Sequence, residues 1–162
     1  YEIGSGLVGS EMCIRDSKKS VDSIHKELGR VMWEYVGMGR TAEGLKTGLA
    51  KLKEIRKEFE TELFIPGSKE GMNIELDKAI RLNDFITMGE LIAYDALNRN
   101  ESCGGHFREE YQTEEGEAKR DDENYFYVAC WEYQGSDDKA PVLYKEPLVY
   151  EAIKVQTRNY KS

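Results

Sequence analysis

The segment from Asn73 to Asn98 constrains the fold of this chain more than any other. Its spacing predicts one long helix, and the apolar residues lie almost all the way round it. They are Leu76, Ala79, Ile80, Leu82, Phe85, Ile86, Met88, Leu91, Ile92, Ala93, Ala96 and Leu97. A helix that is apolar on all sides is normally buried. We therefore expect this helix at the centre of a bundle, with close neighbours at Gly89, Ala93 and Ala96.

Two earlier segments have the period of amphipathic helices, and their apolar faces can pack against the central helix. The first is Ser20–Val36, which Gly37 ends, and the second follows Thr41, a typical N-cap residue, and ends at Pro66. Their apolar stripes consist of Val21, Ile24, Leu28, Val31, Met32 and Tyr35, and of Leu45, Leu49, Leu52, Ile55, Phe59 and Leu63. The pattern predicts a mainly α fold, an antiparallel three-helix bundle over residues 18–100, with the third helix covered by the other two and by something else.

The chain after residue 100 has a different composition and no longer shows a helical period. A long polar loop covers residues 101–123, and "NYFYVACWEYQ" (124–134) is rich in the aromatic and β-branched residues of strands. A turn then leads to "VLYKE" (142–146) and "LVYEAIKV" (148–155), which offer one or two more strands. We predict that residues 101–162 form the polar loop and a small antiparallel β hairpin or sheet that packs on the bundle.

Charge and composition exclude some classes of function. The chain has 23 basic and 31 acidic residues, a net charge of −8, and the bases are dispersed among the acids. This balance argues against nucleic acid as a partner. No run approaches the roughly 18 apolar residues of a membrane helix, so we expect no direct membrane insertion. Few cysteines and no visible secretory signal favour a reducing compartment.

The loop sequence "CGGHFREE" (103–110) permits three chemical interpretations, none of them complete. Cys103 and His106 have the spacing of half a zinc site, but the other candidates, His25 and Cys130, lie in a helix and a strand. The same pair lacks the third group that would orient a nucleophile and its base. Gly104 and its neighbouring glycine alone do not make a phosphate-binding loop.

The simplest interpretation is structural. We expect five charged residues to hold the loop by charge-assisted hydrogen bonds, either within the loop or to a neighbouring domain. They are His106, Arg108, Arg120, Asp121 and Asp122. His25 is interpreted as a surface or boundary residue of the first helix. The sequence assigns no catalytic, cofactor-binding or metal-binding residue to this chain.

Residues 1–17 fit none of these patterns. "EMCIRDS" (11–17) can be encoded by GAG ATG TGT ATA AGA GAC AGN, which resembles the transposase end used to build short-read DNA libraries. "GLVGS" (6–10) similarly resembles the priming site placed before it. We interpret residues 1–17 as an artefactual, disordered leader translated from a sequencing adapter, and exclude them from the fold. Natural sequence is then expected to start at about Lys18, as the C-terminal piece of a longer protein.

Two motifs resemble a known family. "LNDFITMGELIAYDALNRNESCGGHFREE" and "RDDENYFYVACWEY" are similar to the C-terminal region of the flavoprotein subunit of succinate dehydrogenase and fumarate reductase. The resemblance covers residues 18–161. Matching positions are Glu101, Ser102, Gly104, His106, Arg108, Arg120, Asp121, Asp122 and Asn124. The chain departs from the family at Cys103, where an Arg is usual, at Gly105, where an Ala is usual, and in the longer insertion "EEYQTEEGEAK".

The resemblance implies a structural or docking domain that is not catalytic on its own. In that family the whole subunit holds FAD and interconverts succinate and fumarate, through groups upstream of this region, so no cofactor is expected in this fragment. The implied partners are the upstream FAD-binding domain, an iron–sulfur subunit and a membrane anchor. The implied location is cytoplasmic, peripheral on the inner face of the cell membrane.

Two alternatives stay open. The related L-aspartate oxidases resemble this chain through a similar C-terminal bundle, although the long loop and the aromatic strand favour the dehydrogenase. From a different class, the chain is also compatible with a free-standing helical interaction module.

Deletion of residues 1–17 is expected to leave the fold unchanged, since a translated adapter has no selected packing partner. Thermal unfolding followed by circular dichroism should give the same Tm with and without the leader. A loss of more than a few degrees would show that the leader packs on the domain.

Overall fold

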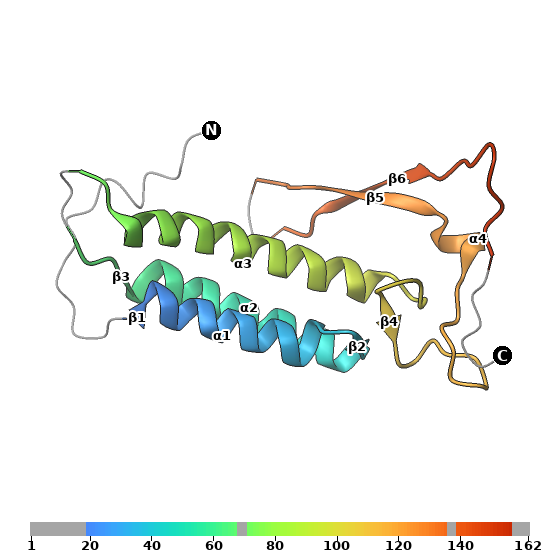
Figure 1. Cartoon of the computed structure of the whole chain (residues 1–162), viewed down its shortest axis with the longest axis horizontal. Helices are drawn as coiled ribbons and strands as arrows, with labels where there is room; N and C mark the ends of the chain where they lie inside the picture. Colours follow the sequence, from blue (N-terminus) through green and yellow to red (C-terminus); the bar gives the residue numbers. More distant parts are fainter. Residues whose placement is uncertain (1–18, 68–70, 136–138, 157–162) are drawn as a thin grey trace.

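The computed structural model describes residues 19–67, 71–135 and 139–156 (Figure 1), so the leader interpreted above lies outside the described residues. The helices are α1 (Val21–Val36), α2 (Ala42–Glu62), α3 (Ile74–Asn98) and the short α4 (Asp122–Tyr125). The strands are β1 (Lys19–Ser20), β2 (Gly39–Arg40), β3 (Leu63–Phe64), β4 (Phe107–Arg108), β5 (Tyr127–Glu132) and β6 (Val142–Pro147).

Each of the three long helices begins directly after a capping residue, and the cap predicted at Thr41 is one of them. The side chain of Ser20 accepts a hydrogen bond from the Ser23 backbone N–H at 3.2 Å, and that of Thr41 accepts one from Gly44 at 3.0 Å. Asn73 caps α3 in the same way. Each such cap satisfies a backbone N–H that has no partner inside its helix and typically contributes ~1 kcal/mol.

Successive long helices run in opposite directions, which confirms the predicted mainly α fold with a three-helix bundle (Figure 1). The core between them is mainly aliphatic, and its largest fully buried members are Ile24, Leu45, Leu52, Leu82 and Ile86. Gly48 lets α1 and α2 approach closely, because a Cβ atom there would lie 2.9 Å from that of Tyr35. No helix among the described residues is both long enough and apolar enough to cross a membrane.

Helix α3 differs from the expectation that it is covered on every side. Only one of its faces is buried, formed by Ala79, Leu82, Ile86, Gly89, Ala93 and Ala96. Its large exposed apolar residues are Ile74, Leu76, Ile80, Phe85, Met88 and Ile92. The physical reason is geometric: a helix in a three-helix bundle has two helical neighbours, and these cover one stripe rather than the whole circumference.

The predicted small antiparallel hairpin is confirmed, and it is formed by β5 and β6. The register pairs Tyr127 with Pro147 and Glu132 with Val142. The hairpin reaches α3 through Trp131, whose indole N–H donates to Asp95 Oδ1 at 2.7 Å and whose ring packs edge-on against Tyr94. The described part of the second candidate segment, 148–155, forms no strand.

Two parallel strand pairs close the ends of the bundle. β1 pairs with β3, which joins the start of α1 to the end of α2. β2 pairs with β4, which joins the α1–α2 turn to the polar loop after α3. Each pair is only two residues long, but each connects segments that are distant in the sequence.

Replacement of Ile86 by Ala should lower the free energy of unfolding by roughly 2–5 kcal/mol, because the side chain is fully buried and its removal leaves a cavity. Ile80→Ala is the matched control, since it makes the same change in the same helix at a position that is 43% exposed. Urea unfolding at constant protein concentration measures both. An equal loss at Ile80 would mean that the outer face of α3 is covered in solution.

Candidate functional site

The polar loop folds back onto the end of the bundle where α3 leaves it, and its strand β4 pairs there with β2 (Figure 1). Its centre is a tight turn in which Cys103 and His106 exchange backbone hydrogen bonds of 2.8 and 3.0 Å. Gly104 lies within the turn at φ +58°, in the left-handed region that favours glycine. Gly104 therefore serves the geometry of this turn.

Arg108 is the most deeply buried charged residue of the loop, with 2% of its surface exposed. Its Nη1 donates to the carbonyl oxygens of Ala96 and Leu97, at 2.9 and 3.3 Å. These carbonyls belong to the last turn of α3, where no intrahelical partner is left and the helix dipole is negative. Arg108 therefore caps α3 from outside the helix, with its guanidinium also over the ring of Tyr111.

Glu110 connects the same arginine to another helix. Its carboxylate accepts a hydrogen bond from Arg108 Nε at 3.1 Å and one from the backbone N–H of Ala42 at 2.5 Å. Ala42 is the first residue of α2, where the dipole is positive. Partial burial acts to raise the pKa of Glu110, but the Ala42 N–H and the Arg108 guanidinium outweigh it, so the pKa is lowered overall.

His106 lies between two arginines. Its Nδ1 is 2.8 Å from Arg40 Nη1, and its Nε2 is 2.9 Å from the Arg99 carbonyl oxygen. A guanidinium can only donate and a carbonyl can only accept, so both contacts are hydrogen bonds only for the neutral ring with its proton on Nε2. Burial lowers the pKa of His106, and the nearby charges of Arg40, Arg108 and Arg99 lower it further, against the raising effect of the Arg99 carbonyl.

Arg40 and Arg99 extend this arrangement in two directions. Arg40 Nε donates to the carbonyl oxygens of Val36 and Gly37, at the end of α1. The Arg99 guanidinium donates to the Tyr125 and Tyr127 carbonyl oxygens and lies over both rings, which ties the end of α3 to the start of β5. Burial lowers the pKa of Arg40 from its usual value.

Glu101 and Ser102 are the buried polar residues at the base of the loop. The Glu101 carboxylate accepts from Arg99 Nη1 at 2.8 Å and from the Asp121 backbone N–H at 2.9 Å. The Ser102 hydroxyl donates to the Arg108 carbonyl oxygen and accepts from the Arg108 N–H. Within the described residues, no buried side-chain nitrogen or oxygen lacks a hydrogen-bond partner.

We call the group formed by Arg40, Arg99, Glu101, Ser102, His106, Arg108 and Glu110 the loop cluster. Of the five residues expected from the sequence, His106 and Arg108 belong to it, and Asp121 joins through its backbone N–H. Arg120 and Asp122 lie outside it and form an ion pair with each other at 2.5 Å. The Asp121 side chain caps α4.

Sequence reasoning missed the other members of the loop cluster. Glu101 and Ser102 carried a signal, since they stand in the motif that resembles the family. Arg40 carried none, because it lies in the α1–α2 turn, far from the loop in sequence, and reaches His106 only through the β2–β4 pair.

The arrangement offers little to a metal or to a nucleophile. Over residues 19–67, 71–135 and 139–156, no group of three or more His, Cys, Asp or Glu side chains is suitably placed to hold a metal ion. Cys103 is a half-buried free thiol and Cys130 an exposed one. Both ring nitrogens of His106 are engaged by other groups, so neither is free to accept a proton from Cys103.

Comparison with known proteins identifies the family. The sequence model described as "Fumarate reductase flavoprotein C-term" matches residues 25–160. The fumarate reductase flavoprotein subunit of Serratia sp. is 32% identical over 111 residues, which are 68% of this chain and 18% of that protein. L-aspartate oxidase 2-b of Nicotiana tabacum is 34% identical over 89 residues, 54% of this chain and 13% of that protein.

A solved structure of the same family has the same fold. The structure described as quinol–fumarate reductase with menaquinol molecules has a TM-score of 0.70 and 26% identity, and the match covers 86% of this chain. The chain spans less than a quarter of the length of the proteins it matches, 23% in that structure. With a family match that covers most of the chain and the same fold, this chain belongs to the C-terminal domains of the succinate dehydrogenase and fumarate reductase flavoproteins.

Proposed function

We propose that this chain is a structural domain that docks onto the rest of an FAD-dependent succinate dehydrogenase or fumarate reductase flavoprotein and contributes no catalytic group. One observation carries the proposal: the charged residues that most resemble a reaction centre are engaged in bonds to the ends of helices. Arg108 holds the last turn of α3, and His106 is held between Arg40 and a carbonyl oxygen. A general acid or base needs a proton that it can exchange with a substrate.

The whole protein would have further partners. FAD and the dicarboxylate would be bound by the flavin-bearing part of the same polypeptide, which makes up most of the length of the relatives. An iron–sulfur subunit and a membrane anchor, which the family resemblance implies, belong to the proposal, and the likeness to a quinol–fumarate reductase with menaquinol supports a partner that handles quinol. The domain would then lie on the cytoplasmic side of the membrane, held there through the complex.

An L-aspartate oxidase is the second candidate, because the tobacco enzyme is 34% identical to this chain. The two candidates differ in the substrate of the full-length protein. Anaerobic incubation with succinate or with L-aspartate, followed by the bleaching of flavin absorbance, distinguishes them. Reduction by aspartate and not by succinate would overturn the first assignment in favour of the second.

Replacement of Arg108 by Met should destabilise the domain by roughly 1–3 kcal/mol, because the carbonyl oxygens of Ala96 and Leu97 lose their buried donor. Arg120→Met is the matched control, since it removes an exposed ion pair worth about 0–1 kcal/mol. Urea unfolding of the chain measures both values.

The same pair of variants tests function in the full-length flavoprotein. Per mole of bound FAD, Arg108→Met should leave the pH profile of kcat unchanged, because no proton of the reaction passes through Arg108 or His106. A shifted profile in correctly folded protein would show that the loop cluster takes part in chemistry, contrary to the proposal.

His106 should make stability depend on pH. Its folded pKa is lowered, so the unfolded state binds more protons in mildly acidic solution. The stability it contributes is present above its unfolded pKa, about 6.5, and is lost as the pH falls through the folded value. His106→Gln should reduce the drop in Tm between neutral and mildly acidic buffer. Equal drops would show that the pKa of His106 is the same in the folded and unfolded states, and would contradict the lowered pKa.

A further inference from the structure

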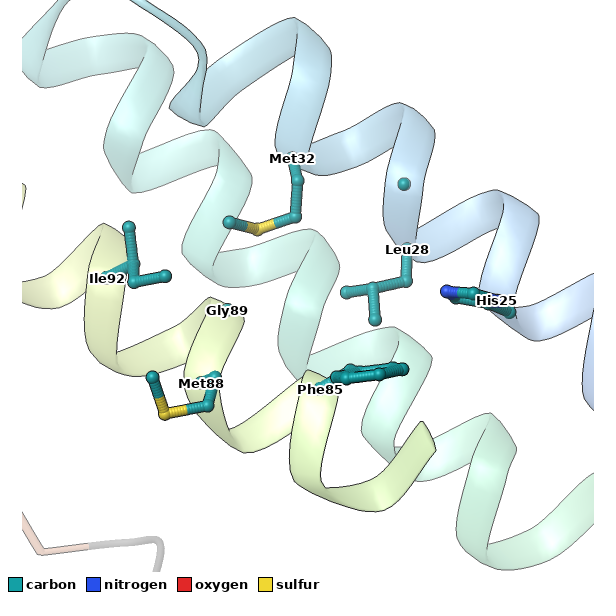
Figure 2. A pocket seen from close by; sticks show the side chains of 8 residues that line it. His25, Leu28, Met32, Phe85, Met88, Gly89 and Ile92 are labelled. Carbon is teal, nitrogen blue, oxygen red and sulfur yellow. The ribbon is translucent and has the colours of Figure 1, made fainter. Parts of the chain in front are cut away.

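An apolar groove runs between α1 and α3 (Figure 2). Its volume is about 280 Å³. Its lining consists of His25, Leu28, Gly29 and Met32 from α1 and Phe85, Met88, Gly89 and Ile92 from α3. Nothing in the loop cluster or in the proposed function so far accounts for it.

The groove has a floor, one closed end and an open top. A Cβ atom on Gly89 would lie 3.1 Å from Met32 Sδ, so the floor is tightly packed, whereas a Cβ on Gly29 would meet nothing within 4 Å. His25 stacks on Phe85 with 5.6 Å between ring centroids and closes the end nearest the start of both helices. The absence of a side chain at Gly29 leaves room for an inserted one.

The side chains that form the walls of the groove expose apolar surface to water, which is unfavourable. Phe85, Met88 and Ile92 are between 41% and 52% exposed, and Trp33, one helical turn beyond Gly29, is 86% exposed. Large exposed apolar side chains that cluster along one groove are the kind of surface that interaction sites use. By contrast, α2 has no large exposed apolar side chain and shows lysines and glutamates to solvent. The bundle thus has one side suited to water and one suited to a partner.

We infer that this groove seats an apolar segment of the flavin-bearing part of the same polypeptide; the inference rests on the proposed function and names the surface that does the docking. In the relatives this domain makes up only 13–23% of the length, so a large neighbour is covalently attached to it there, and the proposed function extends that neighbour to this protein. The described chain enters the bundle at β1, at the same end as the His25–Phe85 stack. A partner that arrives along the chain therefore meets the groove at short range, with a high effective concentration.

Methionine oxidation by hydrogen peroxide tests the inference without any substitution, because its rate follows the exposure of the thioether. Met88 lies in the groove and is 52% exposed in this chain, and Met72 lies outside it, before α3, and is 97% exposed. Both rates are measured by peptide mass spectrometry in this chain and in the full-length flavoprotein. The oxidation rate of Met88 should be roughly tenfold or more lower in the full-length protein than in this chain, while the oxidation rate of Met72 should change less than about twofold.

A substitution provides the second measurement. Met88→Glu should separate the unfolding of the bundle from that of the flavin-bearing part in calorimetry, because a charge cannot enter a dry interface without a large cost. Ile80→Glu is the matched control, being 43% exposed on the same helix and outside the groove lining. Neither substitution should change the Tm of this chain alone by more than a few degrees.

Three outcomes overturn the inference. The first is that oxidation of Met88 is not slowed relative to that of Met72, and the second is that the two glutamate variants behave alike in the full-length protein. The third is that this chain sediments as a dimer that Met88→Glu disperses, which would make a second copy the occupant. If the full-length protein is a flavin enzyme and one of these occurs, only the docking surface is wrong. If it holds no flavin, the proposed function itself has failed.

Discussion

The pair formed by Arg108 and Glu110 connects the ends of two helices, and the rest of the loop cluster is arranged round it. The arginine supplies positive charge and donors to the last carbonyls of α3, and the glutamate supplies negative charge and an acceptor to the first N–H of α2. Each group meets the helix end of opposite polarity, so both dipoles are favoured at once. Ser102, His106 and Arg99 then fix the loop that carries this pair.

Polar groups buried at the end of a bundle carry a risk, because a half-satisfied network is worse than an apolar one. In the described part of the chain the network is fully satisfied, with Glu101 shared between Arg99 and the Asp121 backbone. The neutral state of His106 is part of this balance, since a second proton would face Arg40 directly. The cluster is therefore a rigid attachment of the loop to the bundle.

The sequence predicted those features that depend on neighbours along the chain. Helical period and the cap at Thr41 located the long helices, and aromatic, β-branched composition located β5. Features that depend on distant residues were not predicted. Arg40 has no local sequence signal that marks it as a member of the loop cluster. The apolar pattern of α3 indicated that the helix is covered on all sides, but it could not distinguish cover by this chain from cover by a neighbour. Exposure of Met88 and Phe85 is visible only once the other two helices are in place.

The two short parallel pairs, β1–β3 and β2–β4, have a mechanical consequence. They fasten α1 to its neighbours at both ends, so one helix cannot slide past another by a turn, about 5.4 Å, without breaking a pair. Shear between packed helices, a common way for bundles to change shape, is therefore blocked. A displacement of α1 relative to its neighbours would therefore have to break one of these pairs first.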